Sequence, residues 1–574
     1  MQGYRLFTVA AALLLSAAVF AKENPAKERT QGYVTGGFET NTNVYLKDVK
    51  TLATVPDGHF GSNNYLKVDY YNKRFSAGVQ LEAYAPVAVG FPNILDKAAL
   101  TNYYVAWTDK DFSVTAGTFY EQFGSGLLFR SWEDRALGLN NAVMGARVAY
   151  NFRDIVAVKA LWGMPRFGMK FSDTQVRGGD VSFAISNLVG WQNVYLTLEG
   201  SVLDRYEKLT ASQEAEGLKP NRLGYSARVN FDVNGFFFKG EYVSSGNKVY
   251  DNPNYGAEGF EDDGPYLVKK GNAQLVETGY TGRGLGVSLS LRRLEWMDSK
   301  IVAGGGAPEV NMMNYVPALC TQYTYMLANL HPYGPRTGEI NSRFINSGEI
   351  GGQFDVFYNF RRGTALGGKR GMRLHANFST YYAIAREGGF TPGNLLFRDL
   401  SIDFEKQWTK QFKSVLMWSM QEYNPSYGAN KSTYLQNIIV ADLLYKYTDT
   451  FSTRLELQYL FTQEDKKDWM AALLEVNFAP SWSIYVSDMV NLGTSLVDPT
   501  IFTSKQSLSK YYKNTFSNIK TNPHYFNVGV SYTKSRTRVA LGYGRFKDGY
   551  ICSGGVCRTV PAYTGFNLTL TTSF

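Results

Sequence analysis

The sequence predicts an all-β protein, a single large transmembrane antiparallel β-barrel, and three observations support that prediction. Segments of about ten residues alternate between apolar and polar side chains along most of the chain. Short and long connections alternate between these segments, as in barrels with tight turns at one end and loops at the other. The last segment stops on an aromatic residue, Phe574, in the middle of its alternating pattern.

The first residues are typical of a secretory signal peptide. Arg5 precedes the stretch 7–20, which is almost entirely apolar, and small residues up to Ala21 offer a cleavage site. This apolar stretch is shorter than the roughly 20 residues that a membrane-spanning helix needs. We therefore expect a signal peptide at 1–21, a short periplasmic N-terminus at 22–30 and the barrel at 31–574.

The alternation is clear in individual segments. In 223–231 the odd-numbered residues are apolar, and in 470–478 the even-numbered residues are apolar. We count about 24 strands, an even number as single-chain bacterial barrels require. A count from 20 to 24 is compatible with the pattern, because the alternation is weak in 177–187, in 271–280 and in the hairpin around 462–468.

The connections set the topology. Tight turns are expected at sites such as Asn72-Lys73, Asn234-Gly235 and Asp449-Thr450. Because short and long connections alternate, both termini are expected on the periplasmic side, where such barrels have their short turns. The long connections are 46–64, 86–98, 121–142, 164–177, 206–221, 246–270, 297–350 and 491–523.

Composition excludes several other classes of protein. After residue 21 no run of 18 apolar residues occurs, and three cysteines in 574 residues exclude a disulfide-rich scaffold. The net charge of +9 is spread along the chain without a basic block, so no nucleic-acid partner is expected. Neither a linker nor a shift in composition divides the chain into domains.

A barrel of this size needs a stopper. Barrels of 16 to 18 strands already leave an aqueous channel, and those of about 22 carry a plug. The expected N-terminus 22–30 is too short to be a plug domain. The lumen is therefore expected to be closed by another protein or by loops of this chain, and the candidates are 121–142, 297–350 and 491–523.

The segment 121–142 combines charges, aromatic residues and glycines. One interpretation is a constriction loop, with Arg130, Glu133, Asp134 and Arg135 setting a field across the pore; the other is a folded loop whose charges pair for structural reasons. Acid–base catalysis is disfavoured, because the arginines would hold both carboxylates ionised. The lumenal acids expected near these arginines are Glu82, Glu199 and Asp232.

Other polar residues are also expected to line the lumen. Two neighbouring strands supply charges of both signs: Arg228, Asp232, Lys239 and Glu241. His375, Asn377 and Ser379 share one strand face and could suggest a phospholipase, but that face points into the lumen and away from lipid. Residues spaced by two along a strand are also roughly 6–7 Å apart, too far for a direct bond. No catalytic residue, metal site or cofactor is therefore expected.

The cysteines predict one local disulfide. Cys552 and Cys557 are separated by four residues in the last expected extracellular loop, and an oxidising compartment favours their linkage. Metal binding by this pair is the weaker alternative. Cys320, in the longest loop, has no partner that the sequence identifies.

The C-terminal strand is expected to close the barrel. Apart from Thr572, apolar residues occupy every second position of this strand from Phe566 to Phe574. They form the signal that the barrel-assembly machinery is expected to recognise. The residues of this closing signal are Phe566, Leu568, Leu570 and Phe574.

One stretch resembles a known family. Tyr120–Leu127, read Tyr-Glu-Gln-Phe-Gly-Ser-Gly-Leu, followed by Arg130-Ser-Trp-Glu133-Asp-Arg135, is similar to a segment shared by an uncharacterised family of Bacteroidota outer-membrane barrels. The motif covers some thirty residues and is moderately specific. The resemblance implies the compartment and the fold, and it implies no substrate. TonB-dependent receptors match poorly, because the N-terminal plug and the energy-coupling segment are missing.

Two functional hypotheses follow for a protein expected in the outer membrane. The first is a channel or substrate-selective transporter, favoured by lumenal charges of both signs. The second is a non-conducting barrel subunit of a secretion, assembly or surface complex, favoured by the size of the barrel. A barrel enzyme has the weakest support. The expected partners are outer-membrane lipid, the barrel-assembly machinery, and a lipoprotein or another outer-membrane protein.

Overall fold

The computed structural model describes residues 32–53, 55–95, 97–256, 264–301, 312–316, 320–321, 323–340, 345–553 and 556–574. The expected signal peptide and the N-terminus at 22–30 lie outside these residues. Within the described ranges, no helix combines the length and the apolar character needed to cross a bilayer.

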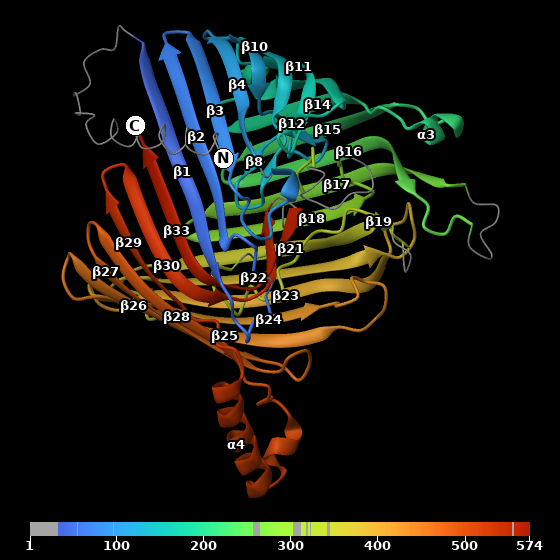
Figure 1. Cartoon of the computed structure of the whole chain (residues 1–574). Helices are drawn as coiled ribbons and strands as arrows, with labels where there is room; N and C mark the ends of the chain where they lie inside the picture. The colour runs from blue at the N-terminus through green and yellow to red at the C-terminus, as the bar shows by residue number, and fades with distance from the viewer. Residues whose placement is uncertain are drawn as a thin grey trace.

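Twenty-four long strands form one closed antiparallel barrel (Figure 1). Each strand pairs with the next long strand along the chain, and β1 pairs with β33 to close the ring. The predicted fold and strand count are confirmed. The barrel strands are β1 (Tyr33–Leu46), β2 (Phe60–Asn72), β3 (Phe75–Tyr84), β4 (Ala98–Thr108), β5 (Phe112–Phe119), β10 (Val143–Phe152), β11 (Val156–Phe167), β13 (Gln175–Ala184), β14 (Val194–Tyr206), β15 (Asn221–Val233), β16 (Phe236–Asp251), β17 (Tyr266–Gly282), β18 (Leu285–Glu295), β21 (Gly348–Phe360), β22 (Met372–Ile384), β23 (Pro392–Gln407), β24 (Phe412–Tyr423), β25 (Tyr434–Lys446), β26 (Phe451–Phe461), β27 (Trp469–Phe478), β28 (Trp482–Asn491), β29 (Asn527–Lys534), β30 (Thr537–Phe546) and β33 (Tyr563–Ser573).

Shorter elements lie in the connections. They are the strands β6 (Gln122–Phe123), β7 (Phe129–Arg130), β8 (Glu133–Asp134), β9 (Leu139–Asn140), β12 (Lys170–Phe171), β19 (Glu339–Ile340), β20 (Ile345–Asn346), β31 (Gly549–Ser553) and β32 (Val556–Val560), the helices α2 (Ile185–Val189), α3 (Ala211–Ala215) and α4 (Lys505–Thr521), and the 3₁₀ turns η1 (Asn93–Leu95) and η2 (Pro499–Thr503).

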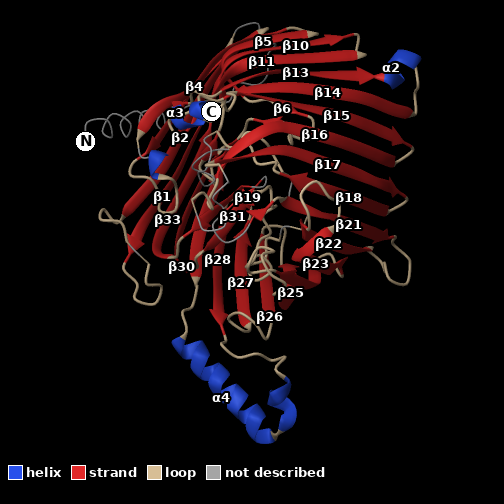
Figure 2. Cartoon of the chain, turned by 90° about the vertical axis from the view of Figure 1, so that its right-hand side faces the viewer, coloured by secondary structure: helices blue, strands red, loops and turns tan. Residues whose placement is uncertain are grey.

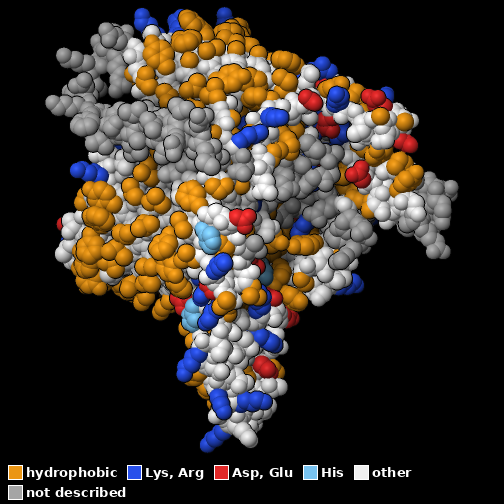
Figure 3. All heavy atoms as spheres, viewed as in Figure 1, with side chains coloured by type: hydrophobic (Ala, Val, Ile, Leu, Met, Phe, Trp, Pro, Cys, Tyr) orange, Lys and Arg blue, Asp and Glu red, His pale blue; other side chains and the backbone are white. Residues whose placement is uncertain are grey.

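The alternating pattern sorts side chains between the two faces of the barrel wall. On β15, Leu223 is 60% exposed on the outside, whereas Arg228, on the opposite parity, is 7% exposed inside. Successive side chains of a strand point to opposite faces, so this pattern puts apolar residues outside and polar residues in the lumen. Hydrophobic side chains gather on the outer wall in Figure 3.

Exposed aromatic residues flank the short turns. Trp107, Tyr150, Phe236, Trp408 and Trp482 each lie within a few residues of a tight turn and are between 41% and 53% exposed. Rings of this kind form a girdle where a barrel meets the polar boundary of a membrane.

The terminal strand closes the ring in a defined register. Gly37 lies opposite Ser573 and Leu46 opposite Thr564. Gly36 and Phe574 exchange two backbone hydrogen bonds of 3.0 Å, one in each direction. The last residue is therefore part of the β1–β33 seam.

Long and short connections lie at opposite ends, with two departures from the expected pattern. The connections 185–193, which contains α2, and 361–371 lie at the short-turn end but are longer than tight turns. Gly363, Gly368 and Gly371 have positive φ, which lets the longer of the two fold back on itself.

The segment 491–523 does not close the lumen, so this part of the prediction is wrong. Its helix α4 projects away from the barrel (Figures 1 and 2). Ser504 caps the helix by accepting a 3.0 Å hydrogen bond from Ser507 N–H, and Asn518 donates to the Leu492 carbonyl at 2.7 Å. The helix carries four lysines, which would lose hydration inside a closed lumen.

Candidate functional site in the barrel lumen

The segment 121–142 folds into the lumen. Within it β6 pairs with β7, and β8 pairs with β9. The Ser125 N–H donates to Glu241 at 3.3 Å. Gly124 lies so close to Arg228 that an added Cβ would be 2.4 Å from the Arg228 Cδ. The segment therefore covers inward-facing side chains of β15 and β16.

Arg135 and Glu133 join this segment to the barrel wall. Arg135 Nη1 lies 2.6 Å from Glu39 Oε2 on β1, and its Nε lies 3.4 Å from Glu133. Gln80 on β3 donates to Glu133 at 2.9 Å. These contacts fix one end of the segment against β1 and β3.

Arg130 and Asp134 have structural contacts within the lumen. The Arg130 guanidinium lies 4.6 Å from the ring centre of Trp132 and 4.0 Å from that of Tyr315, which favours a cation over aromatic faces. Asp134 accepts a 3.0 Å hydrogen bond from Leu137 N–H. The four charged residues that were expected to set a field therefore do not form a single row across the pore.

The lumenal acids expected near the arginines have other partners. Glu82 receives two 2.7 Å hydrogen bonds from Arg166, and both side chains are 1% exposed. Glu199 binds Arg228 at 2.7 Å, and Arg228 also binds Asp180. Asp180, Glu199 and Arg228 lie on adjacent strands, whereas Glu82 on β3 and Arg166 on β11 lie on strands that do not pair, so alternation along the sequence does not reveal the partner of Glu82.

Two of the predicted lumen residues lie at the short-turn end. Asp232 and Lys239 are exposed beside the turn 234–235, and neither forms an ion pair with another residue that the structure describes. Arg228 and Glu241, farther along the same strands, are buried. The lumen is therefore open at this end and filled farther in.

His375 and Asn377 belong to a charged network on the inner wall. His375 lies 2.7 Å from Asp355 and 2.6 Å from Asp403, which are carried by the two adjacent strands. Asn377 donates to Asp355 at 3.1 Å. The histidine is thus held between two carboxylates.

A second segment of the chain packs on the first. Arg130 N–H donates to the Met313 carbonyl at 2.7 Å, and Tyr315 N–H donates to the Gly126 carbonyl at 2.7 Å. We call residues 121–142 together with 312–316 the inner block. Its backbone hydrogen bonds and buried aromatic residues make it part of the barrel core.

Residues 323–340, which we call the docked loop, lie against the inner face of a different part of the barrel wall. Tyr323 donates its hydroxyl to Asp399 at 3.0 Å, and Leu327 N–H donates to Gln458 at 2.9 Å. Gln421 donates to the Ala328 carbonyl at 3.0 Å. Polar side chains of three different strands therefore hold the backbone and one tyrosine of this loop.

An apolar patch on the inner wall receives the docked loop. Leu327 and Ala328 are buried on this patch. A polar lumen was predicted here, although the run Ile438-Ile439-Val440 is apolar on both parities and could have indicated the patch. The wall residues of the patch are Met417, Ile438, Val440, Leu460, Trp469, Ala471 and Met489.

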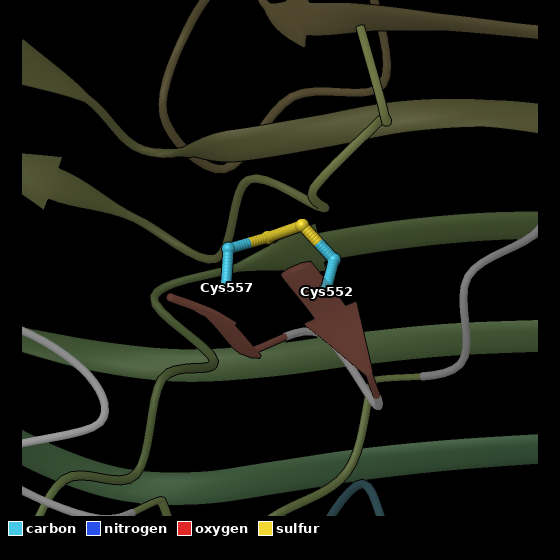
Figure 4. The surroundings of a disulfide bond; sticks show 2 residues. All are labelled: Cys552 and Cys557. Carbon is cyan, nitrogen blue, oxygen red and sulfur yellow. A yellow bond between two sulfur atoms is a disulfide. The ribbon is translucent and has the colours of Figure 1, made fainter. Parts of the chain in front are cut away.

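The hairpin of β31 and β32 folds inward over both segments (Figure 2). A disulfide links Cys552 and Cys557 across it (Figure 4). Val556 is buried in an apolar cluster with Trp132 of the inner block, and Arg558 donates to the Ala136 carbonyl at 3.1 Å. The disulfide therefore stiffens an element that covers the inner block.

Cys320 is buried in the core between the two segments and carries a free thiol. Burial raises the pKa of this thiol to about 12. At neutral pH the thiol is protonated, which makes it a packing residue and a poor nucleophile.

A cavity of about 720 Å³ lies at the long-loop end. The docked loop forms one side of it, the bases of the loops after β14 and β24 form others, and the disulfide hairpin borders it. Its described lining residues include six Lys or Arg and six Tyr or Phe side chains. This cavity could not be predicted from the sequence, because its lining comes from segments that are far apart in the chain.

Comparison with family models matches residues 4–574 to a family described as "Family of unknown function (DUF6029)". No curated protein matches the chain.

Similar solved structures are remote in sequence. The siderophore receptor PirA from Pseudomonas aeruginosa is 9% identical, with 96% of this chain and 82% of that chain covered and a TM-score of 0.41. The siderophore receptor PirA from Acinetobacter baumannii is 10% identical, with coverage of 96% and 81% and a TM-score of 0.38. A mutant porin of Rh. blastica is 11% identical, with coverage of 66% and 100% and a TM-score of 0.25.

Proposed function

We propose that this chain, which belongs to the family of unknown function DUF6029, is an outer-membrane transporter whose passage is controlled by the docked loop. The observation that carries the proposal is the way in which the lumen is closed. Beside the inner block, residues 323–340 complete the closure. Side-chain hydrogen bonds and one apolar patch hold the part around Leu327, and Tyr333 stacks on Tyr381 and Phe397. A stopper of this kind can leave while the barrel stays folded.

The outer surface supports a location in the outer membrane. A closed barrel has no unpaired strand edge, its exposed outer face is apolar, and aromatic residues flank its short turns. With the short turns on the periplasmic side, the docked loop and the cavity of about 720 Å³ face the cell exterior. Substrate would enter from that side.

The alternative is a non-conducting subunit of a surface or secretion complex, with a lipoprotein or another outer-membrane protein as partner. Helix α4 favours it, because this helix projects from the barrel and its segment exposes Phe502, Tyr512 and Phe516. Exposed aromatic residues on a projecting element are typical of a contact surface for another protein.

One substitution separates the two functions. Replacing 323–340 with a Gly-Ser chain of equal length removes the docked side chains and leaves every barrel strand intact. The transporter proposal expects a higher single-channel conductance in planar bilayers and faster entry of bulky antibiotics into cells. Unchanged conductance, together with loss of a protein that co-purifies with the native barrel, would support the complex subunit.

A deletion of 505–521 provides the matched control. It removes the projecting helix and leaves the lumen untouched. The transporter proposal expects no change in conductance from this deletion. The complex-subunit alternative expects loss of the co-purifying protein.

A further inference from the structure

We infer that the cavity at the long-loop end binds a small anionic ligand that carries a ring able to lie on aromatic side chains. The cavity volume of about 720 Å³ is within the range of roughly 300–1,000 Å³ that small-molecule sites occupy. Six of its described lining residues are basic and three are acidic. The inference goes beyond the proposed transport, because binding here does not require conduction.

Four lining residues, Arg205, Arg222, Lys248 and Lys300, form what we call the basic wall of the cavity. The first part of this wall surrounds Glu207. Arg205 and Arg222 both form ion pairs with this carboxylate, the second at 2.8 Å. Arg205 also donates to Ser299 at 2.7 Å. One carboxylate therefore faces two guanidinium groups, both of which line the cavity.

The second part of the wall surrounds Asp298. Lys248 lies 3.6 Å and Lys300 lies 3.5 Å from its carboxylate, and Tyr250 donates to it at 2.5 Å. Lys248 also donates to the Trp296 carbonyl at 2.7 Å. Two ammonium groups thus share one carboxylate whose oxygens already accept a hydroxyl hydrogen bond.

The excess positive charge is buried. Arg205, Arg222 and Lys248 are each at most 9% exposed. A buried ion that lacks an opposite charge destabilises the protein by several kcal/mol, because it has lost its hydration. A bound anion would offset that desolvation penalty. A carboxylate or phosphate group at this wall would face four cations where the described residues of the wall supply two anions.

Aromatic rings also line the cavity. His331 stacks on Tyr423 with ring centres 4.1 Å apart, and the Arg336 guanidinium lies 4.0 Å from the ring centre of Tyr427. Burial lowers the pKa of His331 to about 4, so its ring is neutral at pH 7. Aromatic rings and basic side chains in the lining of one cavity favour a ligand with both a ring and an anionic group.

Isothermal titration of the purified barrel tests the inference with two probes that share this chemistry. Digalacturonate presents carboxylates on sugar rings, uridine diphosphate presents phosphates beside a base and a sugar, and neutral digalactose is the control ligand. Binding of either anionic probe, weakened by added salt, supports the inference, and the stronger probe identifies the source of the anion. The inference is overturned if neither probe binds at roughly 10 mM, or if digalactose binds as tightly.

Substitutions test the location of the site. Lys300→Ala combined with Arg336→Ala removes one cation beside Asp298 and one beside Tyr427, and we expect the affinity to fall at least about tenfold. Lys269→Ala is the matched control, because Lys269 pairs with Glu387 at 2.7 Å outside the cavity. Heat-modifiable migration on gels shows that each variant is folded. Equal affinity in the double variant and the native barrel would refute the site, and so would an equal loss in the Lys269 variant.

The outcomes of the two proposals are separable. Binding with no change in conductance on replacing 323–340 would keep the site and reject the transport function. Raised conductance with no binding would keep the transport function and reject the site.

Discussion

The inner block and the docked loop both fill the lumen, but they are attached in different ways. The inner block contains two small hairpins, exchanges backbone hydrogen bonds between 121–142 and 312–316, and is tied to β1 by Arg135. The docked loop reaches the wall mainly through side-chain hydrogen bonds, one apolar patch and the stacked ring of Tyr333, and its Thr337 carbonyl accepts one backbone hydrogen bond from Met297. A folded constriction and a removable stopper can therefore coexist in one lumen, and the difference is testable by substitution.

The largest effect is expected at the buried ion pair beside the inner block. Arg166→Met leaves Glu82 as an uncompensated buried charge, which costs about 3–5 kcal/mol. We expect little assembled, heat-modifiable barrel in the outer-membrane fraction. Arg177→Met is the control, because Arg177 is 56% exposed in its pair with Asp204 and such pairs contribute little. Normal assembly of the Arg166 variant would show that the inner block does not depend on this pair.

The next effect concerns the cover over the inner block. Cys552→Ser removes a disulfide that closes a very short loop, which loosens the β31–β32 hairpin by about 2 kcal/mol. We expect more frequent brief openings in single-channel records, with assembly unchanged. The double variant Cys552→Ser/Cys557→Ser should behave in the same way. Identical records for native and variant barrels would mean that the hairpin does not restrain the lumen.

The docked loop should respond to pH through His331. Burial lowers the pKa of this residue to about 4, whereas an undocked histidine titrates near its ordinary value of about 6.5. The undocked loop therefore binds more protons between these values, and docking weakens as pH falls from 6.5 towards 4. Asp465, 3.7 Å away, partly opposes the effect. We expect conductance at pH 5 to exceed that at pH 7, and His331→Gln to remove the difference. A pH response that survives in His331→Gln would assign it to another group.

The smallest effect is expected for a single hydrogen bond of the docked loop. Tyr323→Phe removes the 3.0 Å bond to Asp399, worth about 1 kcal/mol, and leaves Gln421 donating to the same carboxylate. We expect a slight rise in open probability without a change in assembly. A loss of assembled barrel would show that this residue supports the fold instead of the closed state.

Much of the barrel could be predicted from the sequence, because period-two alternation and turn residues are local signals. β13 and β17 alternate weakly in sequence, yet both are full strands, since pairing with two neighbours stabilises a strand that its own pattern marks poorly. The contents of the lumen could be predicted only in part. The charges of 121–142 indicated that this segment lies inside, but its partners depend on which strands face one another.

The cavity and the apolar patch could not be derived from local signals. The cavity draws Arg205, Asp298 and Lys547 from three segments that are far apart in the chain. The patch uses apolar residues on the lumenal parity of several strands, where a polar lumen was expected. Both features arise because the chain folds back into its own barrel, and no pattern within a single strand records that step.

Hydrogen–deuterium exchange on the native barrel tests the central claim most directly, because it compares the inner block and the docked loop in the same sample. If 323–340 is a removable stopper, its amides should exchange at least about tenfold faster than those of 121–142, a difference of roughly 1.4 kcal/mol in opening free energy. Equal protection of the two segments would contradict the account, because both would then open only with the barrel itself.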